Sequence, residues 1–243
     1  MTEATQILHA FETAATAPLT YAKSWQKNQQ RPVVGILPMN FPPELVHAAG
    51  ALPTLLQADD EPVSIGYSRI DSFYCGYNRS LVNQTMSDEF GFLSAIMLGD
   101  HCVQLLGTAD TMRNHMPHVP VLYDQLVSTI NSPWAFSESL RCLNALKSQL
   151  EDALDTTISD TALSDSITLF NENRALVRQV YALRTAGDIQ LGSTAMQHIV
   201  KASMVMDRAD HTVLLQQLLA ALQSQDKPAS AALPVFLSGH MCH

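Results

Sequence analysis

The segment RPVVGILPMNFPPELVHAAGALPTLL (residues 31–56) decides the fold class. It begins with a β-branched run, RPVVGIL (31–37), and ends with a second run of strand character, ALPTLL (51–56). Between these runs, PPELVHAAG (42–50) has proline in its first turn and glycine at its end, which is the pattern of a short helix. A strand, a helix and another strand in this order predict two parallel strands joined by a right-handed crossover.

The same alternation continues toward residue 131. Helical patterns cover SLVNQTMSDEFGF (80–92) and HCVQLLGTADTMRNHM (101–116), and strand patterns cover FLSAIML (92–98) and VPVLYD (119–124). Strands separated by helices of about ten residues favour a parallel sheet. We therefore predict an α/β fold whose core is a Rossmann-like parallel sheet, with a helical section beside it.

Long amphipathic helices replace this pattern after Asn131. Ser159 and Asp160 are capping candidates for one of them, and two more helical segments cover about 193–206 and 210–223. The expected buried faces are two apolar stripes, one made by Phe136, Leu140, Leu143, Leu150 and Leu154, the other by Leu163, Ile167, Phe170, Val177 and Tyr181.

These changes of pattern divide the chain into five parts. We expect an N-terminal helical segment, a domain built on the parallel sheet, a helical section packed on it, a linker, and the start of an incomplete second domain, at residues 1–30, 31–131, 132–223, 224–232 and 233–243. The last part contains LPVFLSG, which has the pattern of a strand and a turn. It is interpreted as the first strand of a second sheet, and the alternative is an edge strand of the first sheet.

Composition and charge limit the classes of function. The chain has 243 residues and a formal net charge of −9, without a cluster of Lys and Arg, which argues against nucleic acid as a partner. The N-terminus lacks the features of a signal peptide, and no run approaches the roughly 18 consecutive apolar residues of a membrane span. We therefore expect a cytoplasmic protein without a membrane partner, in which the four cysteines stay reduced.

Two cysteines are the strongest candidates for a chemical site. Cys75 lies in FYCGYNRS, where a loop gives way to a helix, and Cys102 directly follows the third predicted strand. Because the carboxyl ends of parallel strands form a ligand crevice, both sulfurs can meet at one edge, each near a helix N-terminus that favours thiolate. The alternative is two unrelated buried cysteines. Their spacing of 27 residues excludes a CxxC zinc hook, and a zinc site would need two more ligands, with His101 the only local candidate.

Other familiar sites are absent or weaker. The sequence has no GxGxxG, GxxxxGK[ST], HExxH or GxSxG motif, so a phosphate loop and a serine-hydrolase elbow are excluded. Cys142 is interpreted as a packing residue and His47 as a satisfied core or rim histidine. The terminal His240, Cys242 and His243 are interpreted as a chance cluster.

Several segments together resemble one protein family. PPELVHAAGALP contains the order Pro-Glu-x-x-x-Ala-Ala-Gly-x-x-Pro, CGYNRS carries Cys75 followed by Arg79 and Ser80, and FGFLSAIMLGDHC ends at Cys102. These segments and the long helices after them resemble the 2-hydroxyacyl-CoA dehydratase and benzoyl-CoA reductase family, in particular a subunit like the D-component of 2-hydroxyglutaryl-CoA dehydratase. The likeness runs from about residue 31 to the end of the chain.

The resemblance implies a cofactor, a substrate and partners. It implies a four-iron four-sulfur (4Fe-4S) cluster that is held by three cysteines, with Cys75 and Cys102 among them. It also implies a CoA thioester substrate, a second dehydratase subunit, and an ATP-dependent activator protein that supplies a low-potential electron. The implied activity is that of the iron–sulfur subunit of a 2-hydroxyacyl-CoA dehydratase (a lyase) or a related acyl-CoA reductase. Asn40 and Glu44 are the candidate catalytic residues.

Two departures from the family pattern keep a second function open. Val103 stands where the family commonly has Asp after the second cysteine, and Asp110 is a displaced candidate for that role. The family's third cysteine lies inside the second domain, and the position of Cys242 does not match it. The alternative function is a cluster-deficient partner or scaffold subunit of the same fold.

Overall fold

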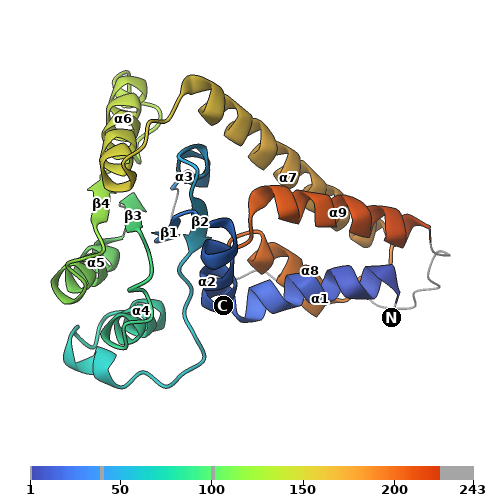
Figure 1. Ribbon diagram of the computed structural model, residues 1–243, viewed down its shortest axis with the longest axis horizontal. Coiled ribbons are helices and arrows are strands. Elements are labelled where there is room, and N and C mark those ends of the chain that lie inside the picture. Colours follow the sequence, from blue (N-terminus) through green and yellow to red (C-terminus); the bar gives the residue numbers. More distant parts are fainter. Residues whose placement is uncertain (1, 39–40, 100–101, 225–243) are drawn as a thin grey trace.

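A four-stranded parallel sheet forms the centre of one part of the molecule (Figure 1). The computed structural model describes residues 2–38, 41–99 and 102–224. The strand order is β2-β1-β3-β4, and all three neighbouring pairs run parallel, so the predicted parallel α/β sheet is confirmed. The strands are β1 (Val33–Ile36), β2 (Leu52–Leu55), β3 (Ala95–Gly99) and β4 (Val121–Asp124).

Helices connect and flank these strands, and a short 3-10 helix, η1 (Ile65–Ser68), lies in the long loop after β2. The α-helices are α1 (Glu3–Thr16), α2 (Pro18–Gln29), α3 (Pro43–Ala48), α4 (Gly76–Met86), α5 (Val103–His115), α6 (Ala135–Leu154), α7 (Asp160–Ala186), α8 (Ser193–Ala202) and α9 (Arg208–Gln223). As predicted, α3 has proline at its start and is followed by Gly50, whose φ of 81° places it in the left-handed region that glycine adopts without strain.

Alternating side chains along the strands bury both faces of the sheet. In β1, Val33 packs with α2, α4 and α5 on one face, whereas Val34 packs with α3 and α6 on the other. In β3, Ile96 and Leu98 share the first face and Met97 lies on the second. Helices therefore cover both faces, which explains why these strands are almost continuously apolar.

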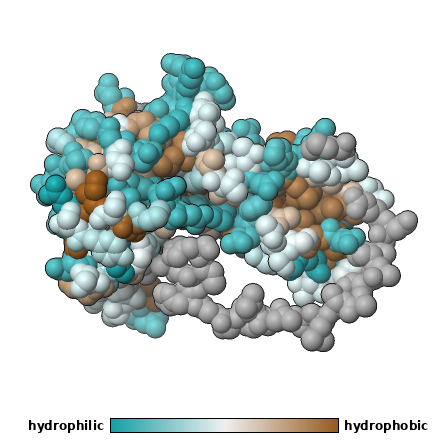
Figure 2. Space-filling model, turned by 90° about the horizontal axis from the view of Figure 1, so that it is seen from below, coloured by the Kyte–Doolittle hydropathy of each residue, from teal (hydrophilic) through white to brown (hydrophobic). Residues whose placement is uncertain are grey.

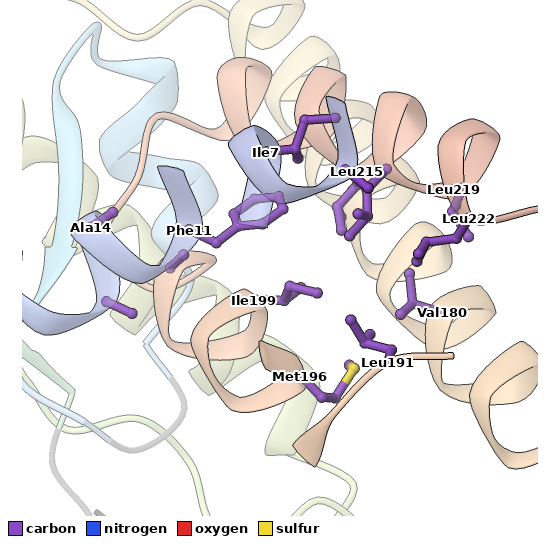
Figure 3. Packing of buried hydrophobic residues seen from close by; sticks show 14 of the residues in the cluster. Ile7, Phe11, Ala14, Val180, Leu191, Met196, Ile199, Leu215, Leu219 and Leu222 are labelled. Atoms are coloured by element: carbon purple, nitrogen blue, oxygen red, sulfur yellow. The ribbon is translucent and has the colours of Figure 1, made fainter. Parts of the chain in front are cut away.

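A separate hydrophobic core lies in an all-helical part made of α1, α7, α8 and α9 (Figure 1). Phe11 of α1 is fully buried there, in one cluster with Ile199 of α8 and Leu215 of α9 (Figure 3). The 27-residue α7 contacts α3 of the sheet part and packs along α9 in the helical part. The two parts are thus connected through α7, and α1 shares its core with helices from the other end of the described chain.

The buried faces of α6 and α7 differ from the predicted stripes. Phe136 and Leu140 in α6 are 80% and 50% exposed, and Ile167 and Tyr181 in α7 are 44% and 45% exposed, so the prediction is wrong for these residues. Apolar residues occur around much of α6, and its contact with β4 selects which face is buried. The side chains that α6 buries are those of Ala135, Cys142, Leu146 and Leu150.

Groups of the same chain cover both outer edges of the sheet. On β4, the Gln149 side chain of α6 accepts from the Tyr123 N–H (3.0 Å) and donates to the Tyr123 carbonyl (3.1 Å). On β2, the Leu55 N–H donates to the Met204 carbonyl at 2.9 Å. Backbone groups at a sheet edge are a template for pairing with another chain, so these contacts protect the sheet.

The predicted linker (224–232, apart from Ser224) and the predicted second-domain segment (233–243) lie outside the described residues. Within the described ranges, no helix combines the length and the apolar character needed to cross a membrane. Hydrophobic side chains are visible on the surface of both the sheet part and the helical part (Figure 2).

Candidate functional site

Both candidate cysteines lie at the start of a helix that begins at the carboxyl edge of the sheet. Cys75 is the N-cap residue of α4 and Cys102 is the N-cap residue of α5, just beyond β3. The helices that follow the neighbouring strands β1 and β3 cover opposite faces of the sheet. This is the switch point at which open α/β sheets form their ligand crevice. The predicted placement of both cysteines at helix starts is confirmed, and their role as ligands stays a prediction.

The Gln104 side chain joins the first turns of these two helices. Its Oε1 accepts a hydrogen bond from the Cys75 backbone N–H at 2.9 Å, and its Nε2 donates to the Phe73 carbonyl at 3.3 Å. Because Gln104 is two residues from Cys102, this amide holds the backbone around Cys75 next to the start of α5. The structure therefore brings the two cysteine-bearing turns to one place.

Asn78 is a buried amide that contacts the Cys75 sulfur. Its Nδ2 donates to Cys75 Sγ at 3.1 Å and lies 3.4 Å from Gln104 Oε1. Its Oδ1 accepts a hydrogen bond of 2.7 Å from the Thr108 hydroxyl of α5. Asn78 and Thr108 are 1% and 0% exposed, so a satisfied polar network lies directly beneath Cys75, whose own side chain is exposed.

The Arg-Ser pair after Cys75 anchors the long loop between β2 and α4. The Ser80 hydroxyl accepts from the Asp59 N–H (3.1 Å) and donates to the Asp59 carboxylate (2.9 Å). The Arg79 guanidinium lies over the ring of Tyr67 at 5.1 Å, within the range of a cation–π contact. Nearby, Tyr77 donates from its hydroxyl to the Leu56 carbonyl at 2.6 Å, and burial raises the pKa of Tyr77, with the Cys75 sulfur adding to the shift.

Tyr74 packs against α5 at Gly107. A Cβ atom at this glycine would overlap the Tyr74 hydroxyl, so the close approach depends on the missing side chain. Both residues line a polar hollow of about 320 Å³, together with the loop residues Tyr67–Asp71 and Thr111. The position of the residue before Cys75 is therefore set by its contact with α5.

The candidate catalytic residues of the β1–α3 region have different placements. Asn40 lies outside the described residues. Glu44 is 9% exposed and forms an ion pair with Arg174 of α7 (2.6 Å), so its carboxylate contacts the helical part. His47 shares a hydrogen bond of 3.0 Å with Ser166 and packs edge-on against Phe170, and burial lowers the pKa of His47. The interpretation of His47 as a satisfied histidine is confirmed.

Three further residues singled out in the sequence take no part in this network. Cys142 is fully buried and donates from its sulfur to the Gln125 carbonyl at 3.0 Å, which confirms its packing role, and burial raises the pKa of the Cys142 thiol. Asp110 pairs with Arg113 at 2.7 Å on an exposed side of α5. Val103, directly after Cys102, is 78% exposed.

The donor atoms at this site suit an iron–sulfur cluster in part. Cys75 and Cys102 offer two thiolates, which are the usual cluster ligands, at helix N-termini that favour negative charge. Within the described part of the chain, no three His, Cys, Asp or Glu side chains gather closely enough to hold a metal ion. His101 and Cys242 lie outside that part. Two cysteines alone leave a cubane short of ligands, so further ligands must come from elsewhere.

The residues that support Cys75 were not found from the sequence. Asn78, Gln104 and Thr108 are ordinary polar residues of two helices, and their connection depends on the contact between α4 and α5. One signal was available, since Asn78 and Gln104 follow the two cysteines by three and two residues. Side chains so close to a helix N-cap can reach the groups of the first turn.

Comparisons with known proteins identify the family to which this chain is similar. The family model described as "2-hydroxyglutaryl-CoA dehydratase, D-component" matches residues 38–243. A benzoyl-CoA reductase subunit of Thauera aromatica is 25% identical over 226 residues, which are 92% of this chain and 58% of that protein. The beta subunit of lactoyl-CoA dehydratase of Anaerotignum propionicum is 25% identical over 227 residues, 92% of this chain and 59% of that protein.

A third relative is more distant. The beta subunit of (R)-2-hydroxyglutaryl-CoA dehydratase of Acidaminococcus fermentans is 23% identical over 223 residues, 87% of this chain and 56% of that protein. The chain thus spans less than two thirds of the length of each of these relatives. Because the family model matches most of the sequence, including both cysteine-bearing turns, this chain belongs to the 2-hydroxyglutaryl-CoA dehydratase D-component family.

Proposed function

We propose that this chain is the iron–sulfur subunit, or part of it, of a 2-hydroxyacyl-CoA dehydratase or a related acyl-CoA reductase. The observation that carries the proposal is the amide bridge of Gln104, which holds the Cys75 turn beside the Cys102 turn at the switch point of the sheet. Family membership supports the same site, because the matched residues include both turns. The relatives' names describe enzymes of CoA thioesters, and we propose a CoA thioester as the substrate here as well.

In this proposal Cys75 and Cys102 provide two of the ligands of a 4Fe-4S cluster. When bound, such a cluster supplies one-electron chemistry. Other residues of the chain position these ligands: Gln104 fixes the Cys75 backbone, and Tyr74 packs the preceding loop on α5. Cys75 itself is exposed to solvent.

The proposal includes two protein partners. Relatives are named as subunits of larger enzymes, which supports a second subunit for this chain. Phe73 and Val103 are 67% and 78% exposed next to the two cysteines, and we propose that a partner protein covers them. We propose that an ATP-dependent activator protein supplies the low-potential electron.

The first test is the metal content of anaerobically purified protein. We expect a brown protein with iron and acid-labile sulfide, because cysteine thiolates are the usual ligands of iron–sulfur clusters. Zinc, or no metal under these conditions and after reconstitution with iron and sulfide, would contradict the proposal.

A second test measures turnover. The chain alone is expected to hold its cluster weakly and to leave 2-hydroxyacyl-CoA unchanged, with turnover only after a second subunit and an ATP-driven electron donor are added. Stable full occupancy and turnover by the isolated chain would show that the partners are not needed.

A cluster-deficient partner or scaffold subunit is the second candidate. It is favoured by one observation: in the ranges that the structure describes, no group of three metal-ligating side chains is present. This candidate predicts a colourless protein that still forms a stable complex with a second dehydratase subunit. Measured iron and sulfide separate the two candidates directly.

A further inference from the structure

We infer that Asn78 tunes the reduction potential of the cluster by donating a hydrogen bond to the Cys75 sulfur. The inference rests on the proposed function, in which Cys75 is a cluster ligand. Hydrogen bonds to ligand sulfurs are among the factors that set the potential of an iron–sulfur cluster, and groups behind the ligands also orient them. The Nδ2–Sγ distance of 3.1 Å is short for such a contact.

The contacts of the neighbouring amide determine which end of Asn78 faces the sulfur. The Cys75 backbone N–H can only donate, so the Gln104 atom 2.9 Å from it is the oxygen Oε1. The Asn78 atom 3.4 Å from this oxygen must then be the nitrogen, because two amide oxygens would repel each other. The same nitrogen contacts Cys75 Sγ, so both of its protons have acceptors.

The other end of the Asn78 amide agrees with this orientation. Its Oδ1 lies 2.7 Å from the Thr108 hydroxyl, which can donate to it. With Asn78 1% exposed and Thr108 fully buried, water does not compete for these contacts. The donor is therefore fixed in place by α4 and α5, independently of what the sulfur binds.

The sign of the effect follows from charge. A donor next to a ligand sulfur stabilises the reduced cluster more than the oxidised one, because the reduced form carries more negative charge. Asn78 should therefore raise the midpoint potential. Its removal should shift the potential to more negative values without removing a ligand.

The Asn78→Leu variant isolates this contact. Leucine is close to asparagine in size and lacks the amide oxygen and nitrogen. In this variant the Thr108 hydroxyl can still donate to the Gln104 backbone carbonyl (3.2 Å), and the Gln104 side chain still accepts from the Cys75 N–H. A second variant, Thr108→Val, keeps the Asn78 amide and removes only the hydroxyl that holds its oxygen. Thr111→Val is the matched control, since Thr111 lies in the next turn of α5 and bonds the Gly107 carbonyl at 2.9 Å.

The experiment compares the wild-type chain and these variants after anaerobic reconstitution with iron and sulfide, using redox titration followed by absorption and electron paramagnetic resonance. We expect a more negative midpoint potential for Asn78→Leu, a smaller shift in the same direction for Thr108→Val, and no shift for Thr111→Val, all at wild-type iron content. An unchanged potential in Asn78→Leu and Thr108→Val at wild-type iron content would overturn the inference alone. Failure of the wild-type chain to take up iron and sulfide would instead overturn the proposed function, and the inference with it.

Discussion

At the scale of single residues, the candidate site depends on contacts between residues that the sequence separates by about thirty positions. Asn78 meets Thr108, Cys75 meets Gln104, and Tyr74 meets Gly107. In each pair one partner belongs to the Cys75 turn or the first turn of α4, and the other to α5. The position of Cys75 therefore reflects how closely these two helices pack.

Gly107→Ala tests whether the Tyr74 contact positions Cys75. Alanine in a helix is normally more stable than glycine by about 1 kcal/mol, but here its methyl group would overlap the Tyr74 hydroxyl. Because a tyrosine ring can swing away, we expect a folded protein with a displaced Tyr74 and faster loss of iron to a chelator. Gly76→Ala is the control, since a Cβ at Gly76 has open space around it. Iron retention equal to wild type in Gly107→Ala would show that this contact is dispensable.

His211 gives a prediction about pH and stability. It is fully buried, with its Nε2 hydrogen-bonded to the Ile199 carbonyl (3.0 Å) and its Nδ1 to the Asn173 amide (2.9 Å), and burial lowers the pKa of His211 to about 4. In an unfolded chain its pKa is about 6.5. Between these values the unfolded state binds a proton that the folded state does not, so stability is lost as the pH falls from about 6.5 toward 4.

The full loss from His211 is about 3 kcal/mol of unfolding free energy. Urea unfolding at pH 7.5 and pH 4.5 measures it, with His211→Gln as the comparison because glutamine can form both hydrogen bonds and does not titrate. The wild-type protein should lose more stability than the variant on acidification. Equal losses would mean that His211 is not the titrating group.

At the scale of elements, the sheet edge at β4 shows how a helix protects a strand. Gln149 of α6 bonds both backbone groups of Tyr123, while Arg113 of α5 reaches the Val121 carbonyl at 3.4 Å. These side chains occupy positions that a further strand would need. The exposed edge is therefore covered within the chain itself.

Gln149→Leu should open this edge. Loss of two hydrogen bonds is expected to lower the unfolding free energy by about 1–2 kcal/mol and to promote self-association through β4. Urea unfolding and sedimentation velocity measure the two effects, with Ser148→Ala on the exposed side of α6 as the control. A monomeric variant of wild-type stability would argue against a protective role for Gln149.

The elements themselves could be predicted from the sequence, because their signals are local. Four apolar runs predict the strands β1 to β4. The prolines at the start of α3 and the glycine after it predict the helix that connects the first two strands. Ser159 was predicted as a capping residue, and it accepts the Ala162 N–H at 3.1 Å. The exposed Phe136 and Tyr181 could not be predicted, since only tertiary packing decides which part of a broad apolar face is buried. The amide network under Cys75 was missed for a similar reason, because it exists only where α4 meets α5.

At the scale of the whole molecule, polar contacts at the start of α3 join the sheet to the helical part. Glu44, at the start of α3, pairs with Arg174, and its backbone carbonyl accepts from the Ser166 hydroxyl at 2.8 Å. Since α3 begins directly after the loop that leaves β1, its position relative to the crevice is tied to α7. The helical part thus fixes the start of α3 relative to the sheet.

The central claim is that Cys75 and Cys102 hold one cluster together, and iron content after anaerobic reconstitution tests it most directly. The measurement compares iron per chain in the wild-type protein and in Cys75→Ser, Cys102→Ser and Cys142→Ser, where the last keeps a donor for the Gln125 carbonyl and serves as the control. We predict that Cys75→Ser and Cys102→Ser each lose most of the bound iron and the brown colour, while Cys142→Ser retains both. Wild-type iron content in either of the first two variants would contradict the shared site.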